Sequence, residues 1–146
     1  DGLHTHKSDW DDLQDIVNLA HQYGLTVDAY IGHPDDLHTF GIPARTPEEV
    51  ASVAKRMQEI GVDMIGLMTG MSYEGVAAGD IPQAIKDRLW ALVGAVSVPT
   101  LAEGGINLAN AKAFKDTGVN ILVVGTAIDN MVCNAAKEAV TPFIAH

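Results

Sequence analysis

The sequence predicts an α/β fold of parallel βαβ units, for three reasons. Apolar runs alternate with helical patterns along all 146 residues. The apolar runs are continuous, which is typical of strands that are covered on both faces. A helix-length segment separates each run from the next, and such crossovers join parallel neighbours in a right-handed sense. We therefore expect a single domain over residues 1–146.

The expected strands are five apolar runs that end in polar or glycine-rich segments. The spacing between them leaves room for one helix between each pair of neighbours. After the second strand, a long loop over residues 32–43 precedes that helix. The strands are expected over residues 1–6, 25–31, 62–68, 98–102 and 119–124.

The expected helices begin at recognisable N-terminal signals. The clearest is Thr46-Pro-Glu-Glu49, with Thr46 as N-cap, Pro47 at the first helical position and Glu49 three residues after the cap. Side-chain oxygens at the other N-caps accept hydrogen bonds from free backbone N–H groups. The other helices are expected to begin at Ser8 or Asp9, Asp80, Asn107 and Asp129, with ends near Gly24, Gly61, Gly118 and Pro142.

The composition limits the classes of partner. The net charge is −10, which argues against nucleic acid or an anionic membrane surface, because both require a basic face. No apolar run is long enough to span a bilayer, and no signal peptide is visible, so we expect a cytoplasmic protein. The single cysteine, Cys133, excludes an intramolecular disulfide and is expected to be a buried small hydrophobe in the last helix.

Two glycine turns indicate a phosphate site. The runs Val98–Asn107 and Ile121–Ile128 each end abruptly in glycine and lead into a helical pattern. Such turns point backbone N–H groups and the positive end of a helix at one spot, which suits a phosphate. In a (β/α) barrel the loops after the last two strands form such a cradle. The phosphate-binding residues are expected to be Gly104, Gly105, Gly125 and Thr126.

The chain is short for a whole barrel, which usually needs roughly 200 to 250 residues. Two architectures remain: the C-terminal five strands of a TIM-type barrel, or an open five-stranded α/β sheet. A partial barrel exposes its strand edges and its inner face. We therefore expect the remainder of a longer chain, or a second copy in a homo-oligomer, to cover an inner face that includes Val27, Ile65, Leu67, Leu101 and Val123.

Four motifs resemble one enzyme superfamily. They are Gly24-Leu-Thr-Val-Asp-Ala-Tyr-Ile-Gly32, Gly61-Val-Asp-Met-Ile-Gly-Leu-Met-Thr-Gly70, and the two glycine-ended runs above. Together they are similar to strands five to eight of the orotidine-phosphate decarboxylase superfamily, especially its hexulose-6-phosphate synthase and 3-keto-L-gulonate-6-phosphate decarboxylase branch. The resemblance implies a TIM barrel that acts on a sugar phosphate, and it places the histidine that closes the fourth strand on His6.

The chain also departs from that branch. The Asp-x-Lys-x-x-Asp motif of the third strand is absent, Met68 stands where the branch has His, and Glu103 stands where it has a small residue. A strand that ends in Ala-Glu-Gly resembles instead the epimerases of N-acylmannosamine phosphates, in which that Glu lines the active site. The reaction therefore stays open between a lyase (aldolase or decarboxylase) and an isomerase.

Three residues are the expected catalytic groups. Glu103 ends a strand beside the phosphate turns, where a carboxylate with a pKa raised by burial can transfer protons. Asp28 lies inside an apolar strand and needs a partner, for which a ligand, a metal or a lysine would serve. His6 is the third, on the resemblance. The expected substrate-binding residues are His33, Met68, Thr69 and Gly70.

No residue is assigned as a metal ligand. His4 and His6 have the spacing of metal ligands on a strand, and His33, Asp35, Asp36 and His38 lie in one loop. Neither spacing is a specific motif. We expect no certain cofactor, with a divalent cation such as Mg²⁺ as the alternative. The expected partner is a small phosphorylated substrate, and a non-catalytic phosphate-binding or assembly module is the competing function.

Overall fold

The computed structural model describes residues 1–33, 40–71 and 79–144. The predicted strands and helices are present, with one additional short strand, β3. The strands are β1 (Gly2–Thr5), β2 (Thr26–Gly32), β3 (Ile42–Pro43), β4 (Met64–Met68), β5 (Thr100–Glu103) and β6 (Ile121–Val123). The helices are α1 (Trp10–Gln22), α2 (Pro47–Glu59), α3 (Gln83–Ala95), α4 (Ala111–Lys115) and α5 (Thr126–Ile144).

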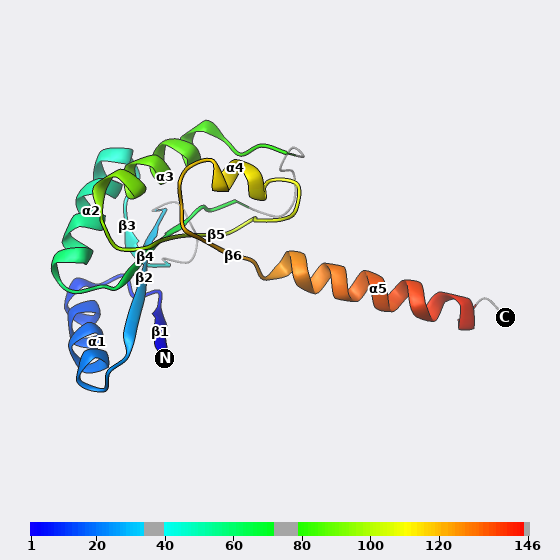
Figure 1. Cartoon of the computed structure of the whole chain (residues 1–146), viewed down its shortest axis with the longest axis horizontal. Coiled ribbons are helices and arrows are strands. Elements are labelled where there is room, and N and C mark those ends of the chain that lie inside the picture. The colour runs from blue at the N-terminus through cyan, green and yellow to red at the C-terminus, as the bar shows by residue number, and fades with distance from the viewer. Residues whose placement is uncertain (34–39, 72–78, 145–146) are drawn as a thin grey trace.

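The strands form one parallel sheet in the order β1-β2-β4-β5-β6, and β3 pairs with the end of β2. Consecutive long strands are therefore neighbours, as they are around a (β/α) barrel and not in a doubly wound sheet. The five-strand sheet with helices between its strands is a partial TIM-type barrel, which confirms the predicted fold class (Figure 1). All five strands have their carboxyl ends at one edge.

The hydrophobic core lies between the sheet and the helices α1, α2 and α3 (Figure 1). Val27, Ile65 and Leu67 are fully buried in it. Their assignment to the inner face was therefore wrong, because alternate residues of a strand point to opposite faces and these three point toward the helices. Leu101 and Val123 do lie on the inner face, where the strand register places Leu101 beside Gly66, and Val123 beside Glu103.

Two helix starts agree with the capping signals. The Asp9 carboxylate accepts hydrogen bonds from the N–H groups of Asp11 and Asp12 at the start of α1. Thr46 and Glu49 form a complete capping box at the start of α2, with Pro47 at its first position. These local signals therefore fix where the first two helices begin.

Three other helix starts were predicted wrongly. Helix α5 begins at Thr126 and not at Asp129, and it continues through Pro142 to Ile144. Asp80 does not cap α3: its carboxylate accepts from Ile81 N and pairs with Lys86, and the helix begins after Pro82. Asn107 accepts from the N–H groups of Ala109 and Asn110, which builds a turn, and α4 begins only at Ala111. Asp and Asn side chains stabilise such turns as readily as they cap helices.

Helix α5 extends away from the rest of the chain (Figure 1) and has no buried residue. Cys133 is consequently exposed, so the prediction of a buried thiol was wrong. A stripe of exposed apolar side chains follows the helical spacing along α5: Ile128, Val132, Val140 and Phe143. Among the described helices, none is long and apolar enough to cross a membrane.

Candidate functional site

The inner face of the sheet carries polar side chains, whereas the face covered by the helices is apolar. The register pairs His4 with Asp28, Tyr30 with Gly66, and Met68 with Glu103. Residues paired across parallel strands share a face, so the side chains from β1, β2 and β5 point to the same side. His6 follows β1 by one residue and contacts the same group. We call His4, His6, Tyr30 and Glu103 the inner-face cluster.

Asp28 positions His4. Its Oδ2 lies 2.5 Å from His4 Nδ1, and the Asp28 residue is 9% exposed. A carboxylate can only accept this hydrogen bond, so the proton sits on Nδ1 and the lone pair of His4 is on Nε2. The buried carboxylate predicted to need a partner therefore has one, and the partner is a histidine. Asp28 acts through His4 and is a positioning residue.

Three donor atoms converge at the carboxyl end of the sheet. His4 Nε2 lies 3.1 Å from His6 Nε2. His6 Nε2 lies 3.9 Å from Glu103 Oε2. All three atoms are within 4.8 Å of one another. Burial lowers the pKa of His6, and the neighbouring His4 lowers it further, which favours the neutral imidazole that can bind a ligand through nitrogen. Two imidazole nitrogens and one carboxylate oxygen thus lie together.

Two buried oxygens beside these donors have no partner of good hydrogen-bond geometry among the described residues: Tyr30 Oη and Glu103 Oε2. Tyr30 is 1% exposed, and its ring lies 4.9 Å from the His4 ring and 5.1 Å from the His6 ring. Burial raises the pKa of Tyr30 well above its usual range, and the charge of Glu103 and a hydrogen-bonding contact with it raise the pKa further. The Tyr30 hydroxyl and the Glu103 carboxylate therefore contact each other, and both retain hydrogen-bonding capacity for a further group.

The position of the Tyr30 ring depends on Gly66. A Cβ atom at Gly66 would lie 2.3 Å from Tyr30 Cε1 and 2.5 Å from Tyr30 Cδ1. The absence of a side chain on β4 therefore leaves the space that the ring on β2 occupies. In this way a glycine in one strand holds a tyrosine of the next strand against both histidines.

The first glycine turn is fastened to β4 by Thr69. The Thr69 hydroxyl donates to Gly104 O at 2.7 Å and accepts from Met71 N, while Thr69 N donates to Glu103 O. Gly104 and Gly105 both have positive φ, at 109° and 67°. A Cβ at Gly104 would lie 2.6 Å from the Thr69 hydroxyl oxygen. Thr69, one of the predicted substrate-binding residues, thus holds this turn beside Glu103 through its hydroxyl.

The second glycine turn lies beside the first. Val123 pairs with Glu103 in the register, so Gly125 and Thr126 leave the sheet next to Gly104 and Gly105. Thr126 is the first residue of α5, and the first turn of a helix leaves N–H groups without intrahelical partners. The two predicted phosphate turns are therefore adjacent at the same edge of the sheet as the inner-face cluster.

The remaining predicted residues fall at the same edge or outside the described chain. Met68 shares the inner face with Glu103, and Gly70 follows it in a left-handed conformation. His33 lines a pocket of about 260 Å³ together with Thr69 and the buried Arg88, whose guanidinium donates to Ala44 O. Asp35, Asp36 and His38 lie outside the described residues, so the loop cluster is not placed.

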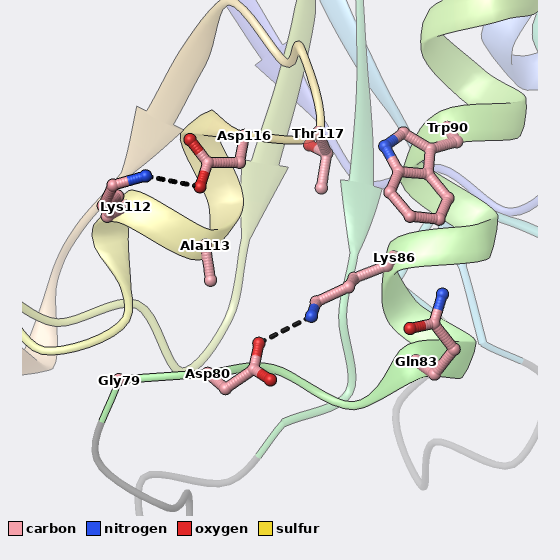
Figure 2. Close-up of a pocket in the computed structure, with 9 residues that line it drawn as sticks. All are labelled: Gly79, Asp80, Gln83, Lys86, Trp90, Lys112, Ala113, Asp116 and Thr117. Atoms are coloured by element: carbon pink, nitrogen blue, oxygen red, sulfur yellow. Dashed lines mark hydrogen bonds and ion pairs between the residues drawn. The ribbon is translucent and has the colours of Figure 1, made fainter.

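A further pocket, of about 250 Å³, lies between α3 and α4 in the helical layer. Figure 2 shows two lysines in it, and each is paired with an aspartate: Lys86 with Asp80 at 2.6 Å, and Lys112 with Asp116 at 2.7 Å. Its charges are thus neutralised, and it lies on the opposite side of the sheet from the inner-face cluster. The carboxyl end of the inner face remains the candidate site, as it is in TIM barrels.

The sequence matches no protein-family model and no curated protein. The YdjI aldolase from Escherichia coli K12 superposes with a TM-score of 0.58 at 22% identity, over 95% of this chain and 48% of that chain. The HMG-CoA lyase from Brucella melitensis superposes with a TM-score of 0.54 at 21% identity, over 77% of this chain and 38% of that chain. The chain thus spans half or less of these barrel proteins. At this identity the likeness establishes the fold alone.

The sequence interpretation missed Tyr30 and gave His4 no catalytic role. Both had a readable signal. Tyr30 is two residues from Asp28 on the same strand, and alternate strand residues share a face. His4 stands opposite Asp28 once β1 and β2 are aligned in parallel. The strand position of Asp28 therefore predicts that Tyr30 and His4 lie on the same face.

Proposed function

We propose that this chain forms the phosphate-binding end and part of the reactive centre of a lyase that acts on a small phosphorylated carbonyl compound. The observation that carries the proposal is one juxtaposition. Glu103, whose Oε2 is buried, stands immediately before the Gly104-Gly105 turn, and Gly125 follows Val123, the residue that pairs with Glu103 in the register. The proposed proton-transfer group and the proposed phosphate-binding turns are therefore neighbours.

The phosphate anchor is proposed at the two glycine turns. Backbone N–H groups and the start of α5 supply positive potential without a lysine or arginine. The long-range field of a chain with a net charge of −10 repels anions. Local backbone groups are therefore the suitable means of binding a phosphate here. The resemblance of these turns to the hexulose-phosphate synthase and ketogulonate-phosphate decarboxylase branch supports the same assignment.

The chemistry is proposed at the inner-face cluster. In an aldol-type cleavage a base accepts the proton of the hydroxyl β to a carbonyl, the carbon–carbon bond breaks, and the electron pair forms an enolate that is then protonated. Glu103 is the proposed proton acceptor, because its carboxylate ends β5 on the inner face, directly before the Gly104-Gly105 turn. The aldolase and lyase names of the two superposed barrels favour a lyase over an isomerase.

The test for chemistry measures enolate formation directly. The protein is incubated in D₂O with a panel of phosphorylated ketoses and their unphosphorylated counterparts, and NMR follows deuterium incorporation and cleavage. We expect exchange with phosphorylated members only, and its loss in Glu103→Gln at unchanged thermal stability. Exchange that persists in Glu103→Gln removes this residue from the mechanism, and no exchange with any member of the panel contradicts the lyase proposal.

The test for phosphate uses Gly125, which is sterically the cleanest position. No atom lies within 4 Å of a Cβ built there, and its φ is not left-handed. Gly105 is unsuitable because a Cβ would lie 2.7 Å from Met71 Cβ. We expect Gly125→Asp to weaken phosphate binding and Gly125→Ala, the matched control, to keep it. Equal binding by both variants would place the phosphate elsewhere.

A further inference from the structure

We propose that His4, His6 and Glu103 bind one divalent transition-metal ion, and that zinc matches the ligand set best. Within residues 1–33, 40–71 and 79–144 this is the one group of three His, Cys, Asp or Glu side chains whose ligand atoms lie close enough to share an ion. Two imidazole nitrogens and a carboxylate oxygen are typical zinc ligands, whereas Mg²⁺ prefers oxygen.

The distance between the two histidines fits a shared ion. Two nitrogens bound to zinc at about 2.0–2.1 Å in a tetrahedral arrangement lie roughly 3.3 Å apart. His4 Nε2 and His6 Nε2 are separated by 3.1 Å. Glu103 Oε2 is 3.9 Å from His6 Nε2, which is too long for a hydrogen bond, and it lies within 4.8 Å of both histidine nitrogens, so the carboxylate has to move closer to join the same coordination sphere.

Asp28 prepares His4 as a ligand. It accepts the Nδ1 proton, so His4 Nε2 carries the lone pair and faces the other two donors. Histidines that bind metals commonly donate their other ring N–H to a carboxylate, which fixes the tautomer and makes the free nitrogen more basic. The pair of the exposed His4 and the buried Asp28 therefore has the arrangement that supports metal binding.

Two buried oxygens supply an independent observation. Tyr30 is 1% exposed, and its Oη contacts the Glu103 carboxylate but has no partner of good hydrogen-bond geometry among the described residues. Glu103 Oε2 is likewise buried without a partner of good geometry. A cation bound by Glu103 satisfies this oxygen, and a water or substrate oxygen in the fourth position on the ion can hydrogen-bond to Tyr30 Oη. Three protein ligands and one open position are typical of catalytic zinc sites.

The catalytic meaning of the site rests on the proposed lyase function, whereas metal binding itself does not. In that reaction a carbonyl oxygen in the open position develops negative charge as the enolate forms, and a divalent ion stabilises that charge. Glu103 binds through Oε2, which leaves its second oxygen for proton transfer. In this arrangement Asp28 contacts the ligand His4, and Tyr30 faces the open fourth position. Both are therefore positioning residues.

The experiment titrates the untagged full chain with Co²⁺ as a spectroscopic substitute for zinc, and then displaces it with Zn²⁺. We expect one Co²⁺ per chain, with visible absorption bands that zinc abolishes. His6→Gln and Glu103→Gln should each weaken binding at least about tenfold, and Asp28→Asn about 10- to 100-fold. His21→Gln is the matched control, because His21 also pairs with an aspartate, Asp63, at 2.9 Å but belongs to no group of three ligands.

The outcomes separate the two proposals. Binding lost in His6→Gln and kept in His21→Gln supports the metal site, even if no substrate is turned over. Equal loss in both variants, or Co²⁺ binding that His6→Gln and Glu103→Gln leave intact, overturns it. Deuterium exchange that continues at full rate after chelation, in protein shown to be metal-free, overturns the catalytic role of the ion and leaves the lyase proposal standing. Circular dichroism of every variant confirms that the chain is folded.

Discussion

Gly66→Ala tests how the site is held together. The built Cβ at Gly66 overlaps the Tyr30 ring, with 2.3 Å to Cε1, 2.5 Å to Cδ1 and 2.8 Å to Cζ. These distances are well inside van der Waals contact, so the ring must move. Because the ring packs against the His4 and His6 rings, displacing it also disturbs the inner-face cluster.

The expected magnitude is a balance of two effects. Overpacking one methyl group in a filled core costs about 1–3 kcal/mol. Replacing glycine within a strand recovers about 0.5–1 kcal/mol of conformational entropy. We expect a net loss of about 1–2 kcal/mol in the free energy of unfolding. In a Tyr30→Val background the overlapping ring atoms are absent, so Gly66→Ala should be neutral or stabilising there.

The assay is a double-mutant cycle measured by urea unfolding. The four proteins are the wild type, Gly66→Ala, Tyr30→Val and the double variant. The predicted coupling between the two positions is about 1–3 kcal/mol. If Gly66→Ala costs the same in both backgrounds, the glycine does not accommodate the ring and the packing argument for this site is refuted.

Two further predictions concern acid stability and association. Asp63 is partly desolvated, which raises its pKa, but hydrogen bonds from His21 and from Val27 N outweigh this and lower the pKa below its usual value. The resulting stability is present above the ordinary pKa of about 3.9 and is lost as the pH falls through the lower folded value. The difference in unfolding free energy between wild type and Asp63→Asn should therefore be larger at pH 7 than at pH 3, and an equal difference would contradict the assignment. The exposed apolar stripe of α5 should bind a second copy of the chain. Sedimentation velocity should detect association that Val132→Glu reduces and Asn134→Glu, off the stripe, does not; a monomer at all concentrations would refute this.

The parallel arrangement of strands and helices could be predicted because each βαβ unit is a local feature. Continuous apolar runs indicated strands buried on both faces, and the helix-length spacers required parallel neighbours. The capping box at Thr46 is equally local and was located to the residue. Signals of this kind lie within a few positions of one another, so no knowledge of distant contacts is needed.

Which residues of each strand point toward the helices was harder to predict. In a fully apolar strand such as Met64–Met68 no alternation indicates which face meets the helices, and a shift of one residue reverses every assignment. Val27, Ile65 and Leu67 were placed on the wrong face for this reason. The polar residues Asp28 and Glu103 mark the inner face correctly, and the register extends that face to His4 and Tyr30.

The role of Thr69 shows why a site is less predictable than a fold. Its sequence context, after a strand and before a glycine, fits a substrate contact, but its hydroxyl joins β4 to the Gly104 turn. The helix α5 likewise has a regular apolar pattern, yet none of its described residues is buried. Both features depend on contacts between distant segments, which a local pattern does not specify.

The most direct test of the proposed site is a crystal structure of the chain soaked with Zn²⁺, with an anomalous difference map collected at the zinc edge. We predict one dominant peak on the inner face at the carboxyl end of the sheet, about 2.0–2.2 Å from His4 Nε2, His6 Nε2 and Glu103 Oε2. A strongest peak elsewhere, or a peak that touches only one of these three residues, would contradict the proposed metal site.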